Sequence, residues 1–135
     1  MNYLLDTNVI SYVIDKRTSA LSRFHGIRPE DNLYSCAITE GELLFGVANA
    51  PVGRRAEILA EISGVLVDLA GVVPVDRASA EAYSDIRYHL KVTGQPLPDN
   101  DIWIAAVAMA NGYTLVSHDA AFSRIPGLKL EDWLA

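Results

Sequence analysis

Short apolar runs alternate with segments of helical period along this chain, and this alternation limits the fold more than any other sequence feature. The runs occupy residues 3–5, 33–37, 71–75 and 113–116, and each is followed by polar residues that favour a turn or a helix cap. Such runs are typical of strands buried on both faces. Strands separated by helices form parallel sheets with right-handed crossovers. The sequence therefore predicts an α/β fold with a central, mostly parallel sheet of four or five strands.

The segments between the runs predict one helix after the first strand, two after the second and two after the third. The first of the two helices after the third strand is expected to begin at an Asp76 cap and to end at Gly94. The next spans 102–110, which is apolar on nearly every side, so we expect it to be buried and to stop at Gly112. Pro74 suits the end of a strand or a strand at the sheet edge. The helix after Pro51 and Gly53 has one apolar stripe, formed by Ile58, Leu59, Ile62, Val65, Leu66 and Leu69.

The length of 135 residues is that of one domain, so we expect a single domain over residues 1–135. The chain has 11 Lys and Arg against 17 Asp and Glu, a formal net charge of −6. This balance argues against holding nucleic acid by bulk positive charge, but it permits an enzyme that meets nucleic acid through bound cations. Cys36 is the single cysteine, which excludes a disulfide framework. Without a membrane-length apolar run or a signal segment, we expect a cytoplasmic protein with no membrane partner.

Acidic residues fall at the junctions between the predicted elements. Asp6 directly follows the first strand, and Glu42 is expected near the start of the helix after the second. Asp101 opens the buried helix, and Asp119 follows the last clear strand. Because the carboxyl ends of parallel strands share one edge of the sheet, these four acids are expected to converge in one crevice.

Converging carboxylates repel each other unless a cation lies between them. Two of them about 5 Å apart, at an effective dielectric constant near 20, repel by roughly 3 kcal/mol. Ligands that are all oxygen suit Mg²⁺ or Mn²⁺ and not zinc. The chemistry expected of such a site is metal-assisted attack of water on a phosphodiester.

Each acid also has a structural interpretation, in which it caps a helix. Asp6 could cap a helix that begins at Thr7, and Asp119 could cap a short turn after it. Thr39 and Glu42 fit the capping box T-x-x-E.

Spacing helps to choose between neighbouring acids. Residues two apart on a helix point roughly 200° from each other, so only one of each pair can face a shared crevice. We expect Glu42 and Asp101 to be ligands, and Glu40 and Asp99 to be solvent-exposed or capping residues. His118 is expected to be exposed or capping and not a general base. The basic pairs Lys16–Arg17, Arg54–Arg55 and Arg87/Lys91 could contact RNA phosphates, although solvated surface charge is their default interpretation.

Four motifs in order carry a resemblance to a known family. They are LLDTNVIS at 4–11, ELLFG at 42–46, DNDIWIAAVA at 99–108 and LVSHDAAF at 115–122. Together they resemble PIN domains, and in particular the VapC-type toxins of bacterial toxin–antitoxin pairs. The resemblance implies a three-layer PIN-like fold, with a twisted sheet flanked by helices. It also implies an Mg²⁺- or Mn²⁺-dependent endoribonuclease that hydrolyses RNA phosphodiester bonds by metal-activated water.

Carried over by position, the resemblance gives the catalytic and metal-binding roles to Asp6, Glu42, Asp101 and Asp119. Asn8 and Ser117 would orient the carboxylates or a bound water, although local bonding to the backbone is a nearly equal alternative. The family further implies homodimerisation, higher-order assembly with a cognate antitoxin, and an antitoxin segment in the active-site groove. Apolar residues beyond the needs of one small sheet are compatible with such a partner: Leu43, Leu44, Phe45, Val47, Ile58, Leu59 and Ile62.

Two other functions stay open at this point. One is an aspartyl-phosphate-type phosphohydrolase, because Asp6 directly follows a strand; Asn8, however, stands where such enzymes have a second acid. The other is a non-catalytic PIN-like module that binds a partner and whose acids are all helix caps.

Overall fold

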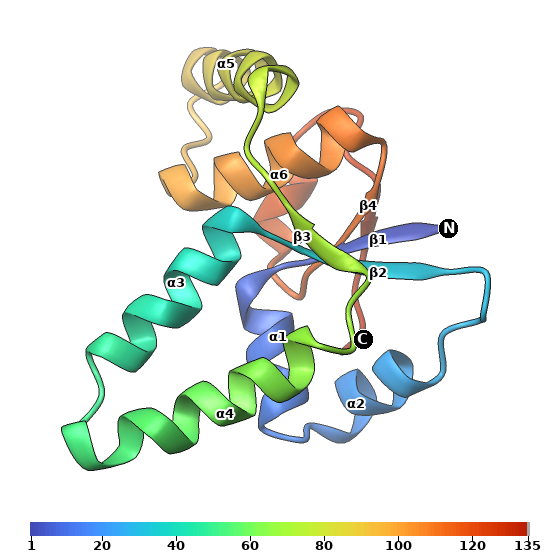
Figure 1. Cartoon of the computed structure of the whole chain (residues 1–135). Helices are drawn as coiled ribbons and strands as arrows, with labels where there is room; N and C mark the ends of the chain where they lie inside the picture. The colour runs from blue at the N-terminus through green and yellow to red at the C-terminus, as the bar shows by residue number, and fades with distance from the viewer. Residues whose placement is uncertain (135) are drawn as a thin grey trace.

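The structure, a computed structural model, describes residues 1–134; Ala135, the last residue of the predicted domain, lies outside the described part. Its centre is a five-stranded sheet in the order β3-β2-β1-β4-β5, and every neighbouring pair is parallel (Figure 1). This confirms the predicted parallel α/β architecture. The strands are β1 (Asn2–Leu5), β2 (Asn32–Cys36), β3 (Gly71–Val73), β4 (Thr114–Val116) and β5 (Leu130–Glu131).

Helices connect the strands in the predicted alternation, with one addition. The helices are α1 (Thr7–Ile14), α2 (Thr18–His25), α3 (Ala37–Ala48), α4 (Arg55–Leu66), α5 (Arg77–Val92) and α6 (Asp99–Asn111), with 3-10 helices η1 (Val52–Arg54) and η2 (Ala120–Arg124). The prediction of one helix between the first two strands is wrong, because the chain breaks at Lys16, which adopts a φ of 59°, and α2 then begins. No helix in residues 1–134 combines the length and the apolar run that a membrane crossing needs.

The strands alternate side chains between two cores, which makes the fold three-layered. Leu4 and Leu115 point to the core under α5 and α6, whereas Leu5 and Val116 point to the core under the other helices. Figure 1 shows the same division, with α5 and α6 above the sheet and α1, α2 and the α3–α4 hairpin below it. The carboxyl ends of β1 and β4, which lie side by side in the sheet, therefore lead into a space bordered by helices of both layers.

Local signals stop these elements close to where the sequence places them. Asp76 accepts the backbone N–H of Ser79 at 2.9 Å and caps α5, as predicted. Gly112 ends α6 in the left-handed conformation, with a φ of 69°, which glycine adopts without steric cost. The third strand is shorter than predicted because it ends at Val73, directly before Pro74, which has no N–H to donate.

Two other predicted boundaries also shift. Ala37, predicted in the second strand, begins α3. The predicted stripe of the helix after Gly53 extends too far, since α4 ends at Leu66 and leaves Leu69 outside it. Within that stripe Ile62 is buried but Leu59 is exposed, so the stripe is only partly covered by the core.

Candidate functional site

Asp6 lies directly after β1 and is buried, with 5% of its surface exposed. Its Oδ1 accepts the backbone N–H of Val9 at 2.8 Å and so caps α1. Its Oδ2 accepts the hydroxyl of Ser117 at 2.5 Å. Burial raises the pKa of this carboxyl from 3.8 to about 6, the two hydrogen bonds oppose the rise, and the nearby charges of Asp101 and Asp119 add to it.

Ser117 joins Asp6 to the loop after β4. The backbone N–H of Asp6 donates to the carbonyl of Val116 at 3.1 Å, which holds the ends of the two strands together. The buried Ser117 hydroxyl, which donates to Asp6, also accepts the backbone N–H of Asp119 at 3.1 Å. The Asp119 carboxylate accepts the backbone N–H of Ala121 at 2.9 Å, and its residue is exposed. Ser117 thus positions both the buried acid and the loop that carries the exposed one.

Glu42 lies in the second turn of α3, where neighbouring elements hold its carboxylate. Oε1 is 2.5 Å from the hydroxyl of Thr7. Because a carboxylate only accepts, Thr7 donates this bond, and the Thr39 hydroxyl, 3.1 Å away, can donate to Thr7 in turn. Oε2 accepts the side-chain amide of Asn100 at 3.4 Å. Residues of α1, α3 and α6 therefore meet at this carboxylate.

The first turn of α6 presents three polar residues in different directions. Asp99 points to α5, Asn100 reaches Glu42, and Asp101 faces the other acids. Burial raises the pKa of Asp101, and the charges of Asp119 and Glu42 raise it further. Within this one turn, Asp101 therefore faces the other acids and Asp99 faces away from them.

The four acids singled out in the sequence act on one another through their charges. Asp6 is affected by Asp101 and Asp119, and Asp101 by Asp119 and Glu42. Asp101 is thus coupled to each of the other three. The ends of β1 and β4 and the starts of α3 and α6 bring these residues into one acidic cluster, although they are far apart in the sequence.

The donor set fits a hard divalent cation, although the side chains are not arranged around one. In residues 1–134, no three or more His, Cys, Asp or Glu side chains form a group that could hold a metal ion as they stand. The carboxylates of Asp6, Glu42 and Asp119 each accept a hydrogen bond from the protein instead. The cluster nevertheless offers only oxygen ligands and contains a buried, destabilised anion, which suits Mg²⁺ or Mn²⁺. Metal binding by these residues stays a prediction.

The capping interpretations hold for two of the acids. Asp6 and Asp119 do cap α1 and η2. The capping box of Thr39 and Glu42 is wrong, because α3 begins two residues before Thr39 and Cys36 is its N-cap. Capping does not occupy the acids, since each oxygen that accepts one backbone N–H keeps a second lone pair.

The remaining predicted positions lie around the cluster. Asn8 is exposed in the first turn of α1, and its side chain makes no hydrogen bond to a residue in 1–134, so its orienting role stays a prediction. Asp99 is the first residue of α6 and does not cap it; instead it accepts the Tyr83 hydroxyl at 2.9 Å. His118 is exposed, as expected, with Nδ1 2.9 Å from Oδ2 of Asp132.

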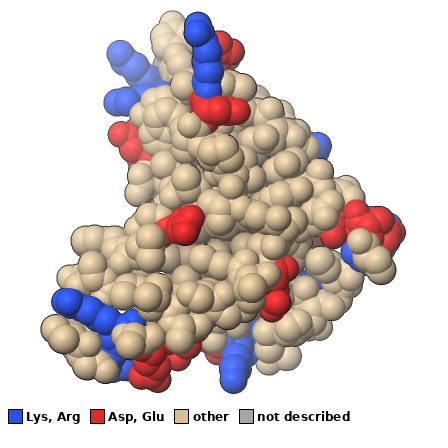
Figure 2. Space-filling view, in the orientation of Figure 1, with Lys and Arg blue, Asp and Glu red and all other residues tan. Residues whose placement is uncertain are grey.

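Two open cavities border the cluster and share Thr7 and Glu42 in their walls. One, of about 690 Å³, also contacts Phe45 and Asn100. The other, of about 430 Å³, extends along α3 and α4 to Arg54. Figure 2 shows the molecular outline indented between α5 and the α3–α4 hairpin, with basic side chains over α5 and over the far ends of α3 and α4. The acidic cluster therefore borders a cleft whose two sides carry basic side chains together with acidic ones.

Sequence reasoning missed Thr7 and Asn100, whose side chains donate hydrogen bonds to Glu42. Both are uncharged and lie next to a predicted acid in the sequence, so a search for metal-binding carboxylates did not select them. Their positions in the sequence could have indicated them, because each lies in a first helical turn beside a predicted acid. Thr7 begins the helix after Asp6, and Asn100 lies between Asp99 and Asp101.

Comparisons with known proteins place this geometry in context. A family model described as PIN domain matches residues 3–128. The VapC ribonuclease Y4jK of Sinorhizobium fredii is 34% identical over 131 residues, which cover 94% of this chain and 94% of that protein. Ribonuclease VapC1 of Haemophilus influenzae is 34% identical over 139 residues and 98% of each chain.

Solved structures share the fold over the same extent. VapBC2 from Rickettsia felis, bound to a DNA fragment from its promoter, matches with a TM-score of 0.91 at 28% identity, covering 98% of this chain and 99% of that one. VapBC-1 from nontypeable Haemophilus influenzae matches with a TM-score of 0.88 at 28% identity over the whole of both chains.

Proposed function

The chain belongs to the PIN-domain family, and from that premise we propose that it is an endoribonuclease dependent on Mg²⁺ or Mn²⁺ that acts as the toxin of a toxin–antitoxin pair in the cytoplasm. The relatives named as VapC ribonucleases cover nearly the whole chain, which supports the ribonuclease assignment. The structural matches to VapBC complexes support the toxin–antitoxin assignment.

One observation carries the catalytic part of the proposal: Glu42, Asp101 and Asp119 gather around Asp6, whose carboxylate is buried. A carboxylate with a pKa of about 6 is largely ionised at neutral pH, although its burial opposes the charge. Asp101, which is half-buried, is raised in pKa by the same kind of surroundings. A divalent cation would relieve both costs at once, so Asp6, Glu42, Asp101 and Asp119 are the residues that would hold it.

In this proposal a bound Mg²⁺ or Mn²⁺ would neutralise the carboxylates and polarise the phosphodiester and its attacking water. The chain itself supplies orientation. Ser117 and the Val9 N–H fix the two oxygens of Asp6, and Thr7 and Asn100 fix those of Glu42. Such supporting bonds hold ligands in place and tune their basicity.

The reaction we propose is hydrolysis by in-line displacement at phosphorus. An oxygen–phosphorus bond forms from water as the bond from phosphorus to the 3′-oxygen breaks. The leaving oxygen takes up a proton, so the products carry 5′-phosphate and 3′-hydroxyl ends. An aspartyl-phosphate mechanism lacks support, because the position two residues after Asp6 is Asn8, which cannot donate a proton as an acid.

The antitoxin is proposed to bind over the α3–α4 hairpin. Of the apolar residues expected there, Leu43 and Ile62 are buried in the core, but Leu44, Leu59 and Phe45 are exposed, Phe45 by 69%. Phe45 also lines the cavity beside Glu42. A partner segment that covers this aromatic ring would block the acidic cluster at the same time. Homodimerisation, alone and within the antitoxin complex, is part of the same proposal.

The direct test is RNA cleavage by the purified protein with Mg²⁺ or Mn²⁺, followed by chemical analysis of the product ends. We expect cleavage that EDTA stops and that added Mg²⁺ restores, with 5′-phosphate on the downstream product. Cleavage that persists in EDTA, or products with 2′,3′-cyclic phosphate, would exclude the mechanism. Absence of cleavage together with normal partner binding would favour the non-catalytic module.

A further inference from the structure

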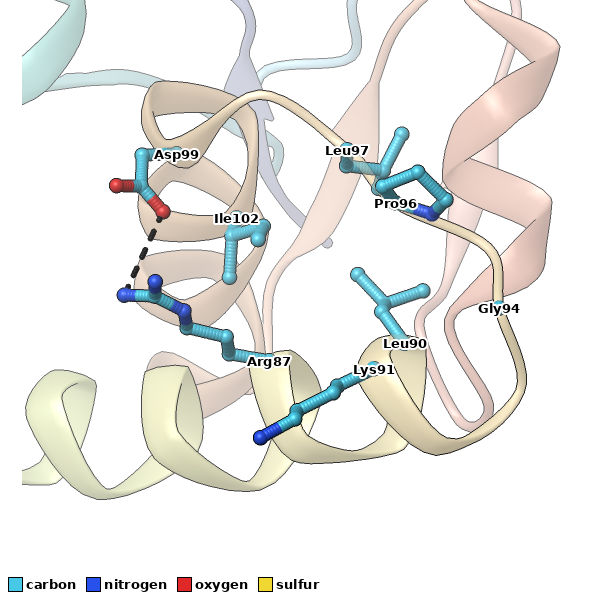
Figure 3. Close-up of a pocket in the computed structure, with 8 residues that line it drawn as sticks. All are labelled: Arg87, Leu90, Lys91, Gly94, Pro96, Leu97, Asp99 and Ile102. Carbon is cyan, nitrogen blue, oxygen red and sulfur yellow. Dashed lines mark ion pairs between the residues drawn. The ribbon is translucent and has the colours of Figure 1, made fainter.

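A cavity of about 350 Å³ lies on the side of α6 that faces away from the acidic cluster (Figure 3). Its floor is apolar and consists of buried Leu90 and Ile102, with half-buried Leu97 beside them. Its rim is cationic, since Arg87 and Lys91 project from successive turns of α5. An apolar floor under a cationic rim suits a nucleotide, whose base is flat and apolar on its faces and whose phosphate is an anion.

The Arg87 guanidinium is held at this rim by a connected set of contacts. It donates to the Tyr83 hydroxyl at 2.7 Å and lies 3.8 Å from Oδ1 of Asp99. Tyr83 in turn donates to Asp99 and stacks on Trp103, with ring centroids 3.8 Å apart. These bonds use only part of the guanidinium, which has five N–H donors.

Lys91 differs from Arg87 because it forms no ion pair or hydrogen bond with any residue in 1–134. Figure 3 shows both side chains leaving α5 at the edge of the cavity, Arg87 toward Asp99 and Lys91 away from it. The loop that closes the cavity is anchored by Arg124, which donates to the carbonyl of Pro96 at 3.1 Å. Two cations therefore lie at this rim, in a chain whose net charge is −6.

The position of this cavity relative to the acids decides its occupant. Asp99 lies in the wall of the cavity, and Asp101, in the same helical turn, faces the acidic cluster. A helix is about 10–12 Å across, so one strand that passes over this turn can reach both sides. We infer that the cavity lined by Arg87 and Lys91 binds a nucleotide of the RNA about two nucleotides from the scissile phosphodiester, with the phosphate against these two cations. This inference rests on the proposed function, since it adds a subsite for the same substrate.

The test measures binding of a fluorescent single-stranded RNA 12-mer in EDTA, so that no cleavage occurs, at several salt concentrations. Each lost phosphate contact lowers the slope of log affinity against log salt by about 0.7 for a single strand. We expect that loss for Lys91→Gln, and weaker binding for Arg87→Gln. The matched control is Arg77→Gln on the same helix, because Arg77 is exposed and, among residues 1–134, forms an ion pair only with Glu81. The Lys91 side chain has no hydrogen-bond or ion-pair partner in the described part of the chain, so its replacement by Gln keeps the test independent of folding.

A second arm identifies the phosphate. RNAs with one neutral methylphosphonate linkage, placed in turn at each position, are bound by the original protein and by Lys91→Gln. We expect one linkage, about two nucleotides from the cleaved bond, whose neutralisation weakens RNA binding by the original protein but not by the variant. Because the two changes are then not additive, this linkage is the one that Lys91 contacts.

The outcomes separate the subsite from the proposed function. Mg²⁺-dependent cleavage together with an unchanged salt slope in Lys91→Gln overturns the subsite and leaves the ribonuclease. Failure of the original protein to bind the RNA overturns the subsite, and failure to cleave with Mg²⁺ overturns the function. Binding of a poly-glutamate peptide that depends on Lys91, without such dependence for RNA, would assign the cavity to an acidic protein segment instead.

Discussion

The hydroxyl of Ser117 donates a 2.5 Å hydrogen bond to Oδ2 of Asp6, which lies 111 residues earlier in the chain. This bond links the ends of two adjacent parallel strands and fixes the orientation of the one acid in the cluster that is buried. Since it stabilises the charged form, it partly offsets the cost of burying the carboxylate. Removing this bond therefore changes the surroundings of Asp6 without removing any acid of the cluster.

The first prediction concerns Asp6→Asn. Asparagine caps a helix about as well as aspartate, so the cap of α1 should be kept. The variant should remain folded, as measured by circular dichroism, and should lose RNA cleavage by at least about 100-fold, because a carboxylate of the acidic cluster is gone.

Its matched control is Asp76→Asn. Asp76 caps α5 with the same type of bond but lies outside the cluster. This control should cleave at the original rate. If both variants cleave equally well, Asp6 is only a cap.

The second prediction is a shift in pH dependence on Ser117→Ala. The hydroxyl lowers the pKa of Asp6, so its loss should raise that pKa further above about 6. The acid limb of the cleavage rate should then move to higher pH in a pH–rate profile. A cost of about 1 kcal/mol in the free energy of unfolding accompanies the lost bond.

For comparison, Ser79→Ala removes a 2.9 Å bond from a serine hydroxyl to the capping acid Asp76 of α5. Its profile should coincide with that of the original protein. If the acid limb of the pH–rate profile does not move in Ser117→Ala, protonation of Asp6 does not determine that limb.

The third prediction concerns stability in EDTA. The pKa of Asp6 is about 6 in the folded chain, above the ordinary value of 3.8. Between pH 3.8 and about 6 the folded state therefore binds the proton more tightly than the unfolded state does. The free energy of unfolding, compared with Asp6→Asn, should therefore fall as pH rises from 4 to 7, by up to about 3 kcal/mol. Urea unfolding at several pH values measures it.

Two further measurements sharpen this result. Asp76 has a lowered pKa because of its bonds to Ser79, so its contribution to the free energy of unfolding has the opposite sign. Measured against Asp76→Asn, it should grow as pH rises toward the ordinary value of 3.8 and be constant from about pH 5 to 7. Adding Mg²⁺ at pH 7 should raise the melting temperature of the original protein and not that of Asp6→Asn. Equal gains in both would place the ion elsewhere.

The fourth prediction tests the partner surface with Phe45→Lys. A lysine in place of an exposed aromatic ring should weaken binding of the cognate antitoxin at least about tenfold, measured by titration calorimetry, since aromatic residues often dominate such interfaces. Val67→Lys is the control, because Val67 is another exposed apolar residue, 78% exposed, at the end of α4. Equal weakening by the two changes would indicate a general effect of charge.

Much of the fold could be predicted because its signals are local. The ends of β1 and β4, the Asp76 cap and the Gly112 stop depend on residues within a turn of each boundary. Helix α2 was missed because its core contribution is only Ala20 and Phe24, too few to reveal a period. Strand β5 was not placed because two residues carry no alternation; it forms only by pairing with β4.

The candidate site divides in the same way. The acids could be predicted because each follows a strand or opens a helix, and the topology of a parallel sheet brings such junctions together. The bond between Thr7 and Glu42 could not, because it depends on how α1 and α3 lie against each other. Asp99 was expected to be exposed or capping; it is exposed, but its contact with Tyr83 on the neighbouring helix could not be predicted.

The sheet ends in strands of three residues, β3, and two residues, β5, and Pro74 follows the first of them. Edges this short offer an incoming peptide very few main-chain partners. The protein is therefore poorly suited to extending its sheet across a subunit boundary or to growing into fibrils by strand addition. The side chains of its helices must instead determine which proteins it binds. This binding specificity can therefore change in evolution without disturbing the sheet.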